Sequence, residues 1–395
     1  MTIKLGLEKL ISDKKTQDLI LGQFGYLCHS ASVDQNLVLG VESLIKVFGQ
    51  RLHKIFGPQH GFVTDVQDNM VETHDFKHPY FNRVIHSLYG ETRIPTDEML
   101  QGLETIVVDL QDVGTRVYTY ISTLNLLMEK CAQKGIRVVV LDRPNPARAD
   151  IVEGTVLDLK WKSFVGQLPI PQRHGLTMGE VALFIRDIMK VKCDVHVVTM
   201  DGYKRSMTWE DTDRHWVNAS PNLSTPNSCL SFPGTVLFEG TKLSEGRGTT
   251  RALEVVGAPD IEPFSLLQKI NGDLKKWNFE GVVLRPQMFW PTFQKHAGKS
   301  CGGFHIHITD SSKALGWRVG QYLLRVFHQE LGKAFEWQDA AYEYEFDKQA
   351  IDLINGTDKL RQWVEQDGTL ASLQELEALG MSEFMQERSS ILLYL

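Results

Sequence analysis

Three short polar segments contain the side chains that are best suited to chemistry. Gly57–Gly61, Gln111–Arg116 and Asp142–Pro146 each follow at once on an apolar run that is predicted to be a β-strand. Ligands of open α/β sheets bind beyond the carboxyl ends of the strands. If the three strands are parallel and adjacent, all three loops open onto one cleft. Each loop alone is explained by ordinary turn formation, whereas the three together favour a site.

The side chains in and near these loops define the chemistry that the cleft supports. They provide carboxylates, guanidinium groups suited to a carboxylate or phosphate ligand, and aromatic hydroxyls of the kind that bind sugars. These residues are Asp109, Asp112, Glu91, Arg116, Arg143, Arg247, Tyr89, Tyr118 and Tyr120. Asp109 has an equal alternative role as a buried strand-end carboxylate that pairs with an arginine.

Other motifs are weaker. The segment Ser244–Thr250 is rich enough in glycine to turn backbone N–H groups towards an anion, but it lacks the Walker lysine, and a tight loop with a Glu–Arg pair explains it equally well. His305 and His307 alternate along a predicted strand and therefore share one face. Without a zincin-type set of His and Asp/Glu, we expect no metal. No Gly-x-Ser-x-Gly elbow indicates an acyl-transfer nucleophile.

The elements that must position these loops alternate between strands and helices. Apolar runs predict strands, and i, i+3/i+4 apolar spacing predicts helices. The predicted strands are Gln23–Cys28, Leu52–Phe56, Val84–Leu88, Thr105–Leu110, Ile136–Leu141 and Val195–Thr199. The predicted helices between them are Val41–Phe48, Tyr120–Lys134 and Met178–Lys190, the last opened by a Thr177/Glu180 capping box. This alternation predicts an α/β fold with a Rossmann-like, mostly parallel sheet and helices on both faces.

The second half of the chain is predicted to form a smaller α+β domain. Composition changes at Asn218–Pro233, which is rich in Ser, Pro and Asn, and beyond it lie a strand at Gly303–Thr309 and helices at Leu315–Gly332 and Leu370–Ala378. We therefore divide the chain into a catalytic domain, residues 1–228, and an auxiliary domain, residues 229–395, that completes the cleft. The acidic segment Tyr342–Asp347 is expected to be a solvated face or loop.

Composition excludes several classes of function. The net charge of −7 and the absence of a basic stripe argue against nucleic acid as a partner. No apolar run approaches the roughly 20 residues that cross a bilayer. The five cysteines show no metal-type spacing, which favours buried free thiols in a reducing compartment. The first eight residues lack the core of a secretory signal, so the chain as given is expected to be cytoplasmic; removal of a signal would make it periplasmic or secreted. No Gly-x-Gly-x-x-Gly follows a strand, and we expect no cofactor.

Taken in order, the motifs resemble those of the NamZ-type exo-β-N-acetylmuramidases, and the resemblance extends over nearly the whole chain. The matching segments are 57–62, 87–90, 109–120, 141–146, 163–166, 174–180, 220–222, 239–241, 244–250 and 295–298. The resemblance implies a Rossmann-like N-terminal domain, a smaller C-terminal domain and a cleft between them. It also implies a glycoside hydrolase that releases terminal β-linked N-acetylmuramic acid (MurNAc) from the non-reducing end of peptidoglycan fragments or muropeptides.

One departure from the family pattern falls on the expected catalytic acid. The family has Gly-Pro-Glu-His-Gly where this chain has Gln59, and an amide cannot protonate a leaving oxygen. Two explanations stay open. The chain is a natural variant in which another carboxyl group acts as the acid, with Glu91 the first substitute, or the glutamate was replaced by glutamine to trap substrate, which leaves a weak or inactive enzyme. If the position itself is decisive, Gln59→Glu raises kcat by typically 10²–10⁴-fold.

The resemblance also implies roles for the remaining candidates. Asp112 or Glu245 orients the nucleophile. His60, Tyr120 and Asn145 bind sugar hydroxyls, and Asn222 and Glu239 also contact the substrate. Arg116, Arg143 or Arg247 binds the lactyl carboxylate. Two other hypotheses stay open: a non-catalytic muropeptide- or sugar-binding protein, favoured by Gln59, and a metal-dependent phosphate-ester or nucleotide enzyme that uses the Arg247 loop.

Overall fold

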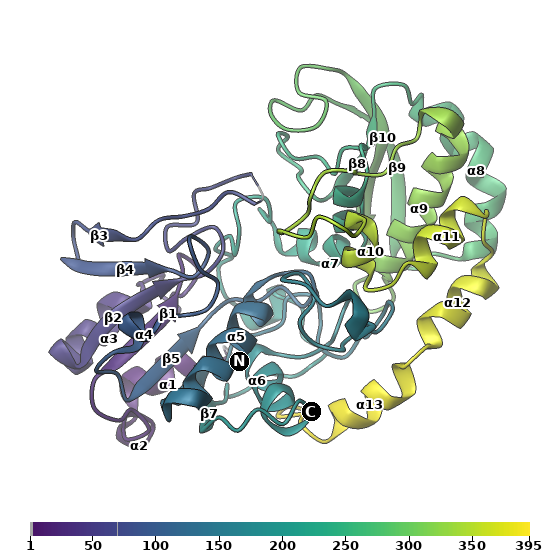
Figure 1. The fold of residues 1–395 in the computed structure, drawn as a ribbon. Coiled ribbons are helices and arrows are strands. Elements are labelled where there is room, and N and C mark those ends of the chain that lie inside the picture. Colours follow the sequence, from purple (N-terminus) through teal and green to yellow (C-terminus); the bar gives the residue numbers. More distant parts are fainter. Residues whose placement is uncertain (1–2, 69) are drawn as a thin grey trace.

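The computed structural model describes residues 3–68 and 70–395, so Met1 and Thr2 of the N-terminal segment lie outside the described residues. Its first half is built on a seven-stranded sheet with the order β3-β4-β2-β1-β5-β6-β7 (Figure 1). The strands are β1 (Phe24–Cys28), β2 (Leu52–Gly57), β3 (Phe76–His78), β4 (Arg83–Ser87), β5 (Thr105–Asp109), β6 (Arg137–Leu141) and β7 (Val195–Val198). All neighbouring pairs are parallel except β3 with β4. The predicted mostly parallel sheet is confirmed.

Helices cover both faces of this sheet because its central strands are apolar on both sides. Ile106 and Val108 of β5 pack in one hydrophobic core with α5 and α6, whereas Val107 belongs to a second core with α1 and α3. The helices are α1 (Gly6–Ser12), α2 (Lys14–Gln17), α3 (Gly40–Phe48), α4 (Asp97–Leu100), α5 (Tyr120–Lys134) and α6 (Met178–Asp187). Thr177 and Glu180 form the predicted capping box of α6. That helix ends three residues before the predicted Lys190, which has a positive φ of 60°.

The loops after β2, β5 and β6 do lie at one edge of the sheet, but their strands are not all adjacent. β5 pairs with β6, whereas β1 lies between β2 and β5. The expectation of three adjacent strands is therefore wrong in this detail, because the β1 run of apolar residues pairs with both neighbours.

The second half has a three-stranded antiparallel sheet with the order β8-β10-β9. Its strands are β8 (Val255–Ala258), β9 (Val282–Phe289) and β10 (Cys301–Ile308). Its helices are α7 (Pro226–Thr235), α8 (Pro263–Trp277), α9 (Gly316–Leu331), α10 (Ala350–Asn355), α11 (Lys359–Glu365), α12 (Leu370–Ala378) and α13 (Met381–Ser389). The predicted boundary at residue 228 falls inside α7, and α13 returns to pack against the first half, where Phe384 contacts Phe184 (Figure 1).

α7 packs closely on α9, and this packing fixes the position of the chain just before the 3₁₀ helix that contains Glu239. A Cβ atom on Gly234 or Gly320 would lie within 3 Å of the backbone of the opposite helix. Only glycine permits this approach, which leads the chain directly into the 3₁₀ helix Val236–Gly240. No helix among the residues that the structure describes has the length and hydropathy needed to cross a membrane.

Candidate active site

The turn after β2 presents Gln59 and His60. The N–H of Gly61 donates to the carbonyl of Pro58 (2.9 Å), and a Cβ on Gly57 would meet the Phe62 nitrogen at 2.7 Å, so the turn is tight. His60 takes a positive φ of 67° there. Sharp strand-end geometry of this kind holds a side chain in one position at the edge of the sheet.

Gln59 contacts a carboxyl group that lies far away in the sequence. Its amide Nε2 donates to Glu343 Oε1 at 3.3 Å, and its Oε1 accepts a hydrogen bond from Thr119. The Tyr89 hydroxyl lies 2.9 Å from both oxygens of Glu343. Gln59 and Glu343 are 7% and 6% exposed. A buried carboxyl group therefore stands next to the position where the family has glutamate.

The environment of Glu343 favours its protonated form. Burial raises its pKa to about 7, which outweighs the opposite effects of the Tyr89 and Gln59 hydrogen bonds and of Arg93, while the charge of Glu239 adds to the rise. A carboxyl group with this pKa is protonated in a large fraction of molecules at neutral pH and is able to act as a general acid.

A second cluster lies on the C-terminal side. Arg247 binds Glu239 (2.6 Å) and Glu245 (3.1 Å), and Lys295 binds Glu245 (2.9 Å). The hydroxyl of Tyr342 donates to Glu239 at 2.7 Å. Burial alone raises the pKa of Glu245, but Lys295 and Arg247 overcome it, and the net pKa is lowered. Glu245 therefore stays ionised at neutral pH, whereas a large fraction of Glu343 is protonated.

His60 follows Gln59 in the chain and lies close enough to Arg247 of the second cluster to feel its charge. Burial lowers its pKa to about 4, and the nearby Arg247 charge lowers it further, so the ring is neutral at pH 7. Its Nδ1 lies 3.1 Å from the Val66 carbonyl oxygen, which can only accept. Nδ1 therefore carries the hydrogen, and Nε2 is left as an acceptor for a hydroxyl.

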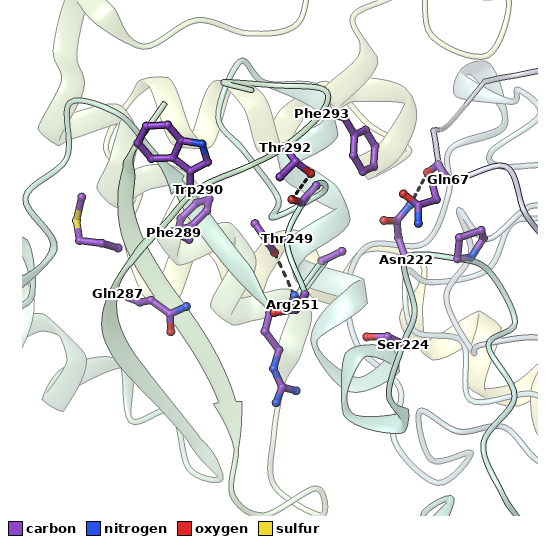
Figure 2. A pocket seen from close by; sticks show the side chains of 15 residues that line it. Gln67, Asn222, Ser224, Thr249, Arg251, Gln287, Phe289, Trp290, Thr292 and Phe293 are labelled. Carbon is purple, nitrogen blue, oxygen red and sulfur yellow. Dashed lines mark hydrogen bonds between the residues drawn. The ribbon is translucent and has the colours of Figure 1, made fainter. Parts of the chain in front are cut away.

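Two cavities adjoin these clusters. The inner pocket has a volume of about 230 Å³, and its wall includes Glu239, Glu245, Lys295 and Tyr342. The outer pocket has a volume of about 600 Å³ and is shown in Figure 2. Asn222 lines the outer pocket, and its side-chain N–H donates to the Gln67 carbonyl at 2.5 Å.

Other predicted site residues are engaged inside the protein. Arg116 is fully buried and donates to the carbonyls of Thr155, Ile170 and Ile354. Arg143 forms a buried ion pair with Asp109 at 2.5 Å, which confirms the structural alternative for Asp109. The fold uses both guanidinium groups, so Arg116 and Arg143 are poor candidates for binding a lactyl carboxylate.

Tyr120 and Asn145 are likewise satisfied internally. The Tyr120 hydroxyl donates to the Ala219 carbonyl (3.0 Å). The Asn145 side chain donates to Leu176 and accepts from Ala147, with 2.9 Å in each case. These bonds shape the strand-end loops, and neither side chain is joined to the two clusters by them.

Asp112 and Glu91 lie apart from the clusters in different ways. Asp112 accepts from the Gly114 N–H at 2.7 Å and lies 3.5 Å from His174, whereas Glu91 is exposed in the loop after β4. Within the part of the chain that the structure describes, no recorded contact joins either carboxyl group to Gln59. The clusters therefore bring together Gln59, His60, Glu239, Glu245 and Arg247 of the predicted residues.

Glu343 and Lys295 belong to the clusters but were not predicted as site residues, and the same holds for Tyr342 and Thr119. Glu343 belongs to the acidic segment that was expected to be solvated; that segment is a loop, but Tyr342 and Glu343 are buried. Lys295 was noted only as part of a motif. The alternation of tyrosine and glutamate over 342–345 was the available signal, since two aromatic side chains beside carboxyl groups are unusual for a solvated loop.

Among residues 3–68 and 70–395, no group of three or more His, Cys, Asp or Glu side chains is arranged to hold an ion. His305 and His307 do share a face, with ring centroids 3.8 Å apart, and Glu254 lies 3.4 Å from His305. All five cysteines are free and buried, as predicted.

Comparisons with known proteins agree on one family. Residues 24–227 match the N-terminal part and residues 230–394 the C-terminal part of the family described as exo-beta-N-acetylmuramidase NamZ. The peptidoglycan beta-N-acetylmuramidase NamZ of Bacillus subtilis (strain 168) is 34% identical over 392 residues, covering 99% of this chain and 91% of the relative.

Solved structures extend the similarity to the fold. Two crystal structures of DUF1343 family proteins from Bacteroides fragilis NCTC 9343 superpose with TM-scores of 0.88 and 0.76, at 29% and 26% identity. Each covers 100% of this chain and 99% of the other. The sequence motifs, the fold and these matches over both halves show that the chain belongs to the NamZ exo-β-N-acetylmuramidase family.

Proposed function

We propose that this protein is a glycoside hydrolase that releases terminal β-linked MurNAc from the non-reducing end of peptidoglycan fragments. The observation that supports it best is the pair Glu343 and Glu245, two buried carboxyl groups with opposite shifts in pKa. Glu245 lines the inner pocket together with Tyr342, the chain neighbour of Glu343. Glycosidases commonly use one protonated and one ionised carboxyl group. Membership of the NamZ family supports the identity of the sugar.

In the proposed reaction Glu343 is the general acid. The bond between C1 of MurNAc and the leaving oxygen breaks, its electron pair goes to that oxygen, and the oxygen takes the proton of Glu343. A water molecule supplies the hydroxyl group to C1 and returns one proton to Glu343. Tyr89 and Gln59 hold the carboxyl group in place through their hydrogen bonds, so Gln59 serves here as a positioning residue.

Glu245 is the ionised partner in this proposal. Its negative charge stabilises the positive charge that develops at C1 or orients the acetamido group of the substrate for assisted attack. His60 Nε2 accepts from a sugar hydroxyl, and Asn222 and Glu239 shape the surrounding walls. Asp112 lies next to His174 in the loop after β5 and is proposed to support that loop.

Lys295 is proposed to bind the lactyl carboxylate. It lines the inner pocket and donates to the Phe238 carbonyl (2.8 Å) and to Glu245 (2.9 Å). An ammonium group has three hydrogens, so these two bonds leave one donor for the substrate. Arg247 pairs with Glu239 and Glu245 and stays a second candidate for binding the lactyl carboxylate, as predicted from the resemblance.

Both halves of the chain contribute residues to the proposed site. Residues 1–228 supply the turn with Gln59 and His60, and residues 229–395 supply Glu239, Glu245 and Glu343, so the second unit completes the cleft. No cofactor is needed for this reaction. The free, buried cysteines support a reducing compartment.

The direct experiment is to measure release of MurNAc from a chromogenic β-MurNAc glycoside. Turnover that is insensitive to a chelator supports the hydrolase and contradicts a metal-dependent phosphate-ester enzyme. The competing function is a non-catalytic sugar-binding protein, which Gln59 favours. Binding of the glycoside without turnover, in both the unchanged chain and Gln59→Glu, would establish the binder and refute the hydrolase.

A further inference from the structure

Glu343 lies in a tight turn that belongs to the second half of the chain. The Glu345 N–H donates to the Tyr342 carbonyl at 3.0 Å, so Glu343 and Tyr344 are the two central residues of the turn. Both have a positive φ, of 46° and 69°. Turns with two positive φ values favour asparagine, aspartate and glycine, and other residues persist in this conformation where their surroundings hold them there. The turn that presents Glu343 therefore depends on contacts outside itself.

Arg93, in the loop after β4, provides such a contact from the first half. Its guanidinium carbon lies 4.2 Å from the centroid of the Tyr344 ring and 4.4 Å from the centroid of the Tyr89 ring. Both distances are well inside the roughly 6 Å over which a cation is attracted to the face of an aromatic ring. The Arg93 side chain is 16% exposed, and this attraction is stronger for a partly desolvated cation. Arg93 therefore joins a ring of the turn to the ring whose hydroxyl binds Glu343.

Glu72 adds a second link between the turn and the first half. The Tyr344 hydroxyl donates to Glu72 Oε1 at 2.7 Å, and Arg93 Nη1 donates to the same oxygen at 3.3 Å. Arg93 Nη1 also donates to the Gly90 carbonyl at 2.5 Å, which holds the guanidinium against its own loop. The ring and carboxylate contacts attach the turn at Tyr344, while Tyr89 binds the carboxyl group of the neighbouring residue.

We propose that Arg93 is a positioning residue for Glu343, which it keeps in the site by binding the ring of Tyr344 to the first half. This inference rests on the proposed function, in which Glu343 is the general acid. Arg93 acts through the turn and is not proposed to contact the substrate. Without this contact the turn is free to move away, so that Glu343 leaves its buried position beside Gln59 and becomes solvated.

The groups around Glu343 determine how such a movement appears in a pH profile. Those that face it from the elements packed against it are Tyr89, Arg93, Glu239, Gln59 and the sulfur of Met70. Burial has the largest effect and raises the pKa of Glu343 to about 7, the charge of Arg93 lowers it, and that of Glu239 raises it. Solvation of Glu343 therefore lowers its pKa, whereas loss of the Arg93 charge alone raises it.

The test measures kcat/KM for the disaccharide MurNAc–GlcNAc as a function of pH. Tyr344→Ala removes the ring that Arg93 binds but keeps the Arg93 charge, and the Tyr344 side chain is 50% exposed. We expect kcat/KM at pH 6 to fall by roughly three- to thirtyfold, the range commonly spanned by a cation–π contact. The descending limb should move to lower pH. Arg93→Ala should also lower kcat/KM, and the double variant should lose less than the product of the two single losses, because the side chains act through one contact.

Two variants serve as controls. Tyr344→Phe keeps the ring and should retain the pH profile. Arg51→Ala removes an arginine that lies 5.5 Å from the Phe48 ring and precedes β2, at the opposite end of that strand from Gln59, and it should change neither the value nor the profile. An unchanged profile in Tyr344→Ala, or single losses that multiply in the double variant, would overturn the proposal. An equal loss in Tyr344→Phe and Tyr344→Ala would also overturn it, because the hydroxyl bond to Glu72 would then hold the turn.

Failure of this inference is distinguishable from failure of the proposed function. If the unchanged protein releases no MurNAc from the disaccharide, the hydrolase is refuted, and titration of the Glu343 carboxyl carbon by NMR decides on the position of the turn. Its signal is assigned by its loss in Glu343→Gln. A lower midpoint in Tyr344→Ala than in Tyr344→Phe would then support the role of Arg93, and equal midpoints would refute it.

Discussion

Glu343 and Glu245 are the two carboxyl groups of the proposed site, and their surroundings shift their pKa values in opposite directions. Burial of Glu343 outweighs the opposing charge of Arg93, so its pKa rises to about 7, while Lys295 and Arg247 lower that of Glu245. A general acid must carry its proton before it reacts. Activity that depends on Glu343 should therefore be present below pH 7 and fall as the pH rises through that value.

Gln59→Glu distinguishes the two candidate positions for the acid. A second carboxyl group about where the Gln59 amide now lies, 3.3 Å from Glu343, would share a proton with it and raise its pKa further. We expect kcat at pH 6 to change by less than about tenfold, and the descending limb of the pH profile to move to higher pH. A hundredfold or larger increase in kcat would show that position 59, and not Glu343, is the position of the general acid. Thr119→Val, which removes the other partner of Gln59, controls for a change of geometry.

Lys295 should determine the preference for MurNAc over GlcNAc, which lacks the lactyl carboxylate. A hydrogen bond to a charged group contributes about 1.5–3 kcal/mol, or roughly ten- to a hundredfold. Lys295→Met is expected to reduce the ratio of kcat/KM values for the two chromogenic glycosides by that factor. Lys299→Met, in the same loop but exposed, should leave the ratio unchanged. An unchanged ratio in Lys295→Met would assign the carboxylate to another cation.

At the scale of elements, the sequence predicts buried and strongly periodic segments well. Tyr120–Lys134 and Leu370–Ala378 are helices with the predicted bounds, and the six strands predicted in the first half are within one or two residues of the observed ones. α7 was not predicted because its Ser, Pro and Asn residues resemble a linker. Thr225 caps it and Pro226 occupies its first turn, where no N–H is needed.

The site was predicted only in part because some of its residues lie far apart in the sequence. Gln59 and His60 are found from the sequence because strand-end loops are where α/β sheets bind ligands. Glu343 lies 284 residues away from Gln59, and no local pattern brings the two together. Arg116 and Arg143 were overvalued because the sequence does not show that carbonyls and Asp109 already use their guanidinium groups.

Glycine at position 248 is required by the loop that separates Arg247 from the outer pocket. Its φ is +80°, and a Cβ atom would lie 2.7 Å from the Phe293 nitrogen. Gly248→Ala should lower the free energy of unfolding by about 1–3 kcal/mol and reduce kcat/KM. Gly272→Ala lies inside α8 with nothing within 4 Å of the added methyl group, and should stabilise the protein by about 0.5–1 kcal/mol. Urea denaturation measures both, and a neutral Gly248→Ala would show that the loop is free to adjust.

At the scale of the whole molecule, the C-terminal segment connects the second half to the first through hydrogen bonds. After α13 the chain returns to the first half (Figure 1). There the Tyr394 hydroxyl donates to Asp142 at 2.6 Å and accepts from the Met200 N–H at 3.0 Å. Glu180 accepts from the Leu393 N–H at 2.9 Å. These bonds explain why α13 belongs by packing to the half that it does not follow in sequence.

Tyr394→Phe tests how much the hydrogen bonds of the C-terminal segment contribute to stability. The substitution leaves the Met200 N–H without its partner and removes one of the hydrogen bonds to the buried Asp142 carboxyl group, which keeps those from Thr177 and Gly179. This loss costs about 1–3 kcal/mol of unfolding free energy. Burial raises the pKa of Asp142 to about 6, so the carboxyl group is ionised at pH 8 and protonated at pH 5. Because the hydroxyl stabilises the ionised form, the loss should be larger at pH 8. Tyr80→Phe, at a ring that is 77% exposed, should change nothing, and an equal effect of the two variants would refute the role.

The central claim is that Glu343 donates the proton in release of MurNAc, and the dependence of Glu343→Gln on the leaving group tests it most directly. The measurement is kcat/KM for MurNAc–GlcNAc, whose leaving oxygen needs a proton, and for 2,4-dinitrophenyl β-MurNAc, whose leaving group does not. We predict a loss of about 10²–10⁴-fold on the disaccharide, little loss on the dinitrophenyl glycoside, and disappearance of the descending limb near pH 7. Glu345→Gln in the same loop should behave as the unchanged protein. An equal loss on both substrates, or none, would contradict the claim.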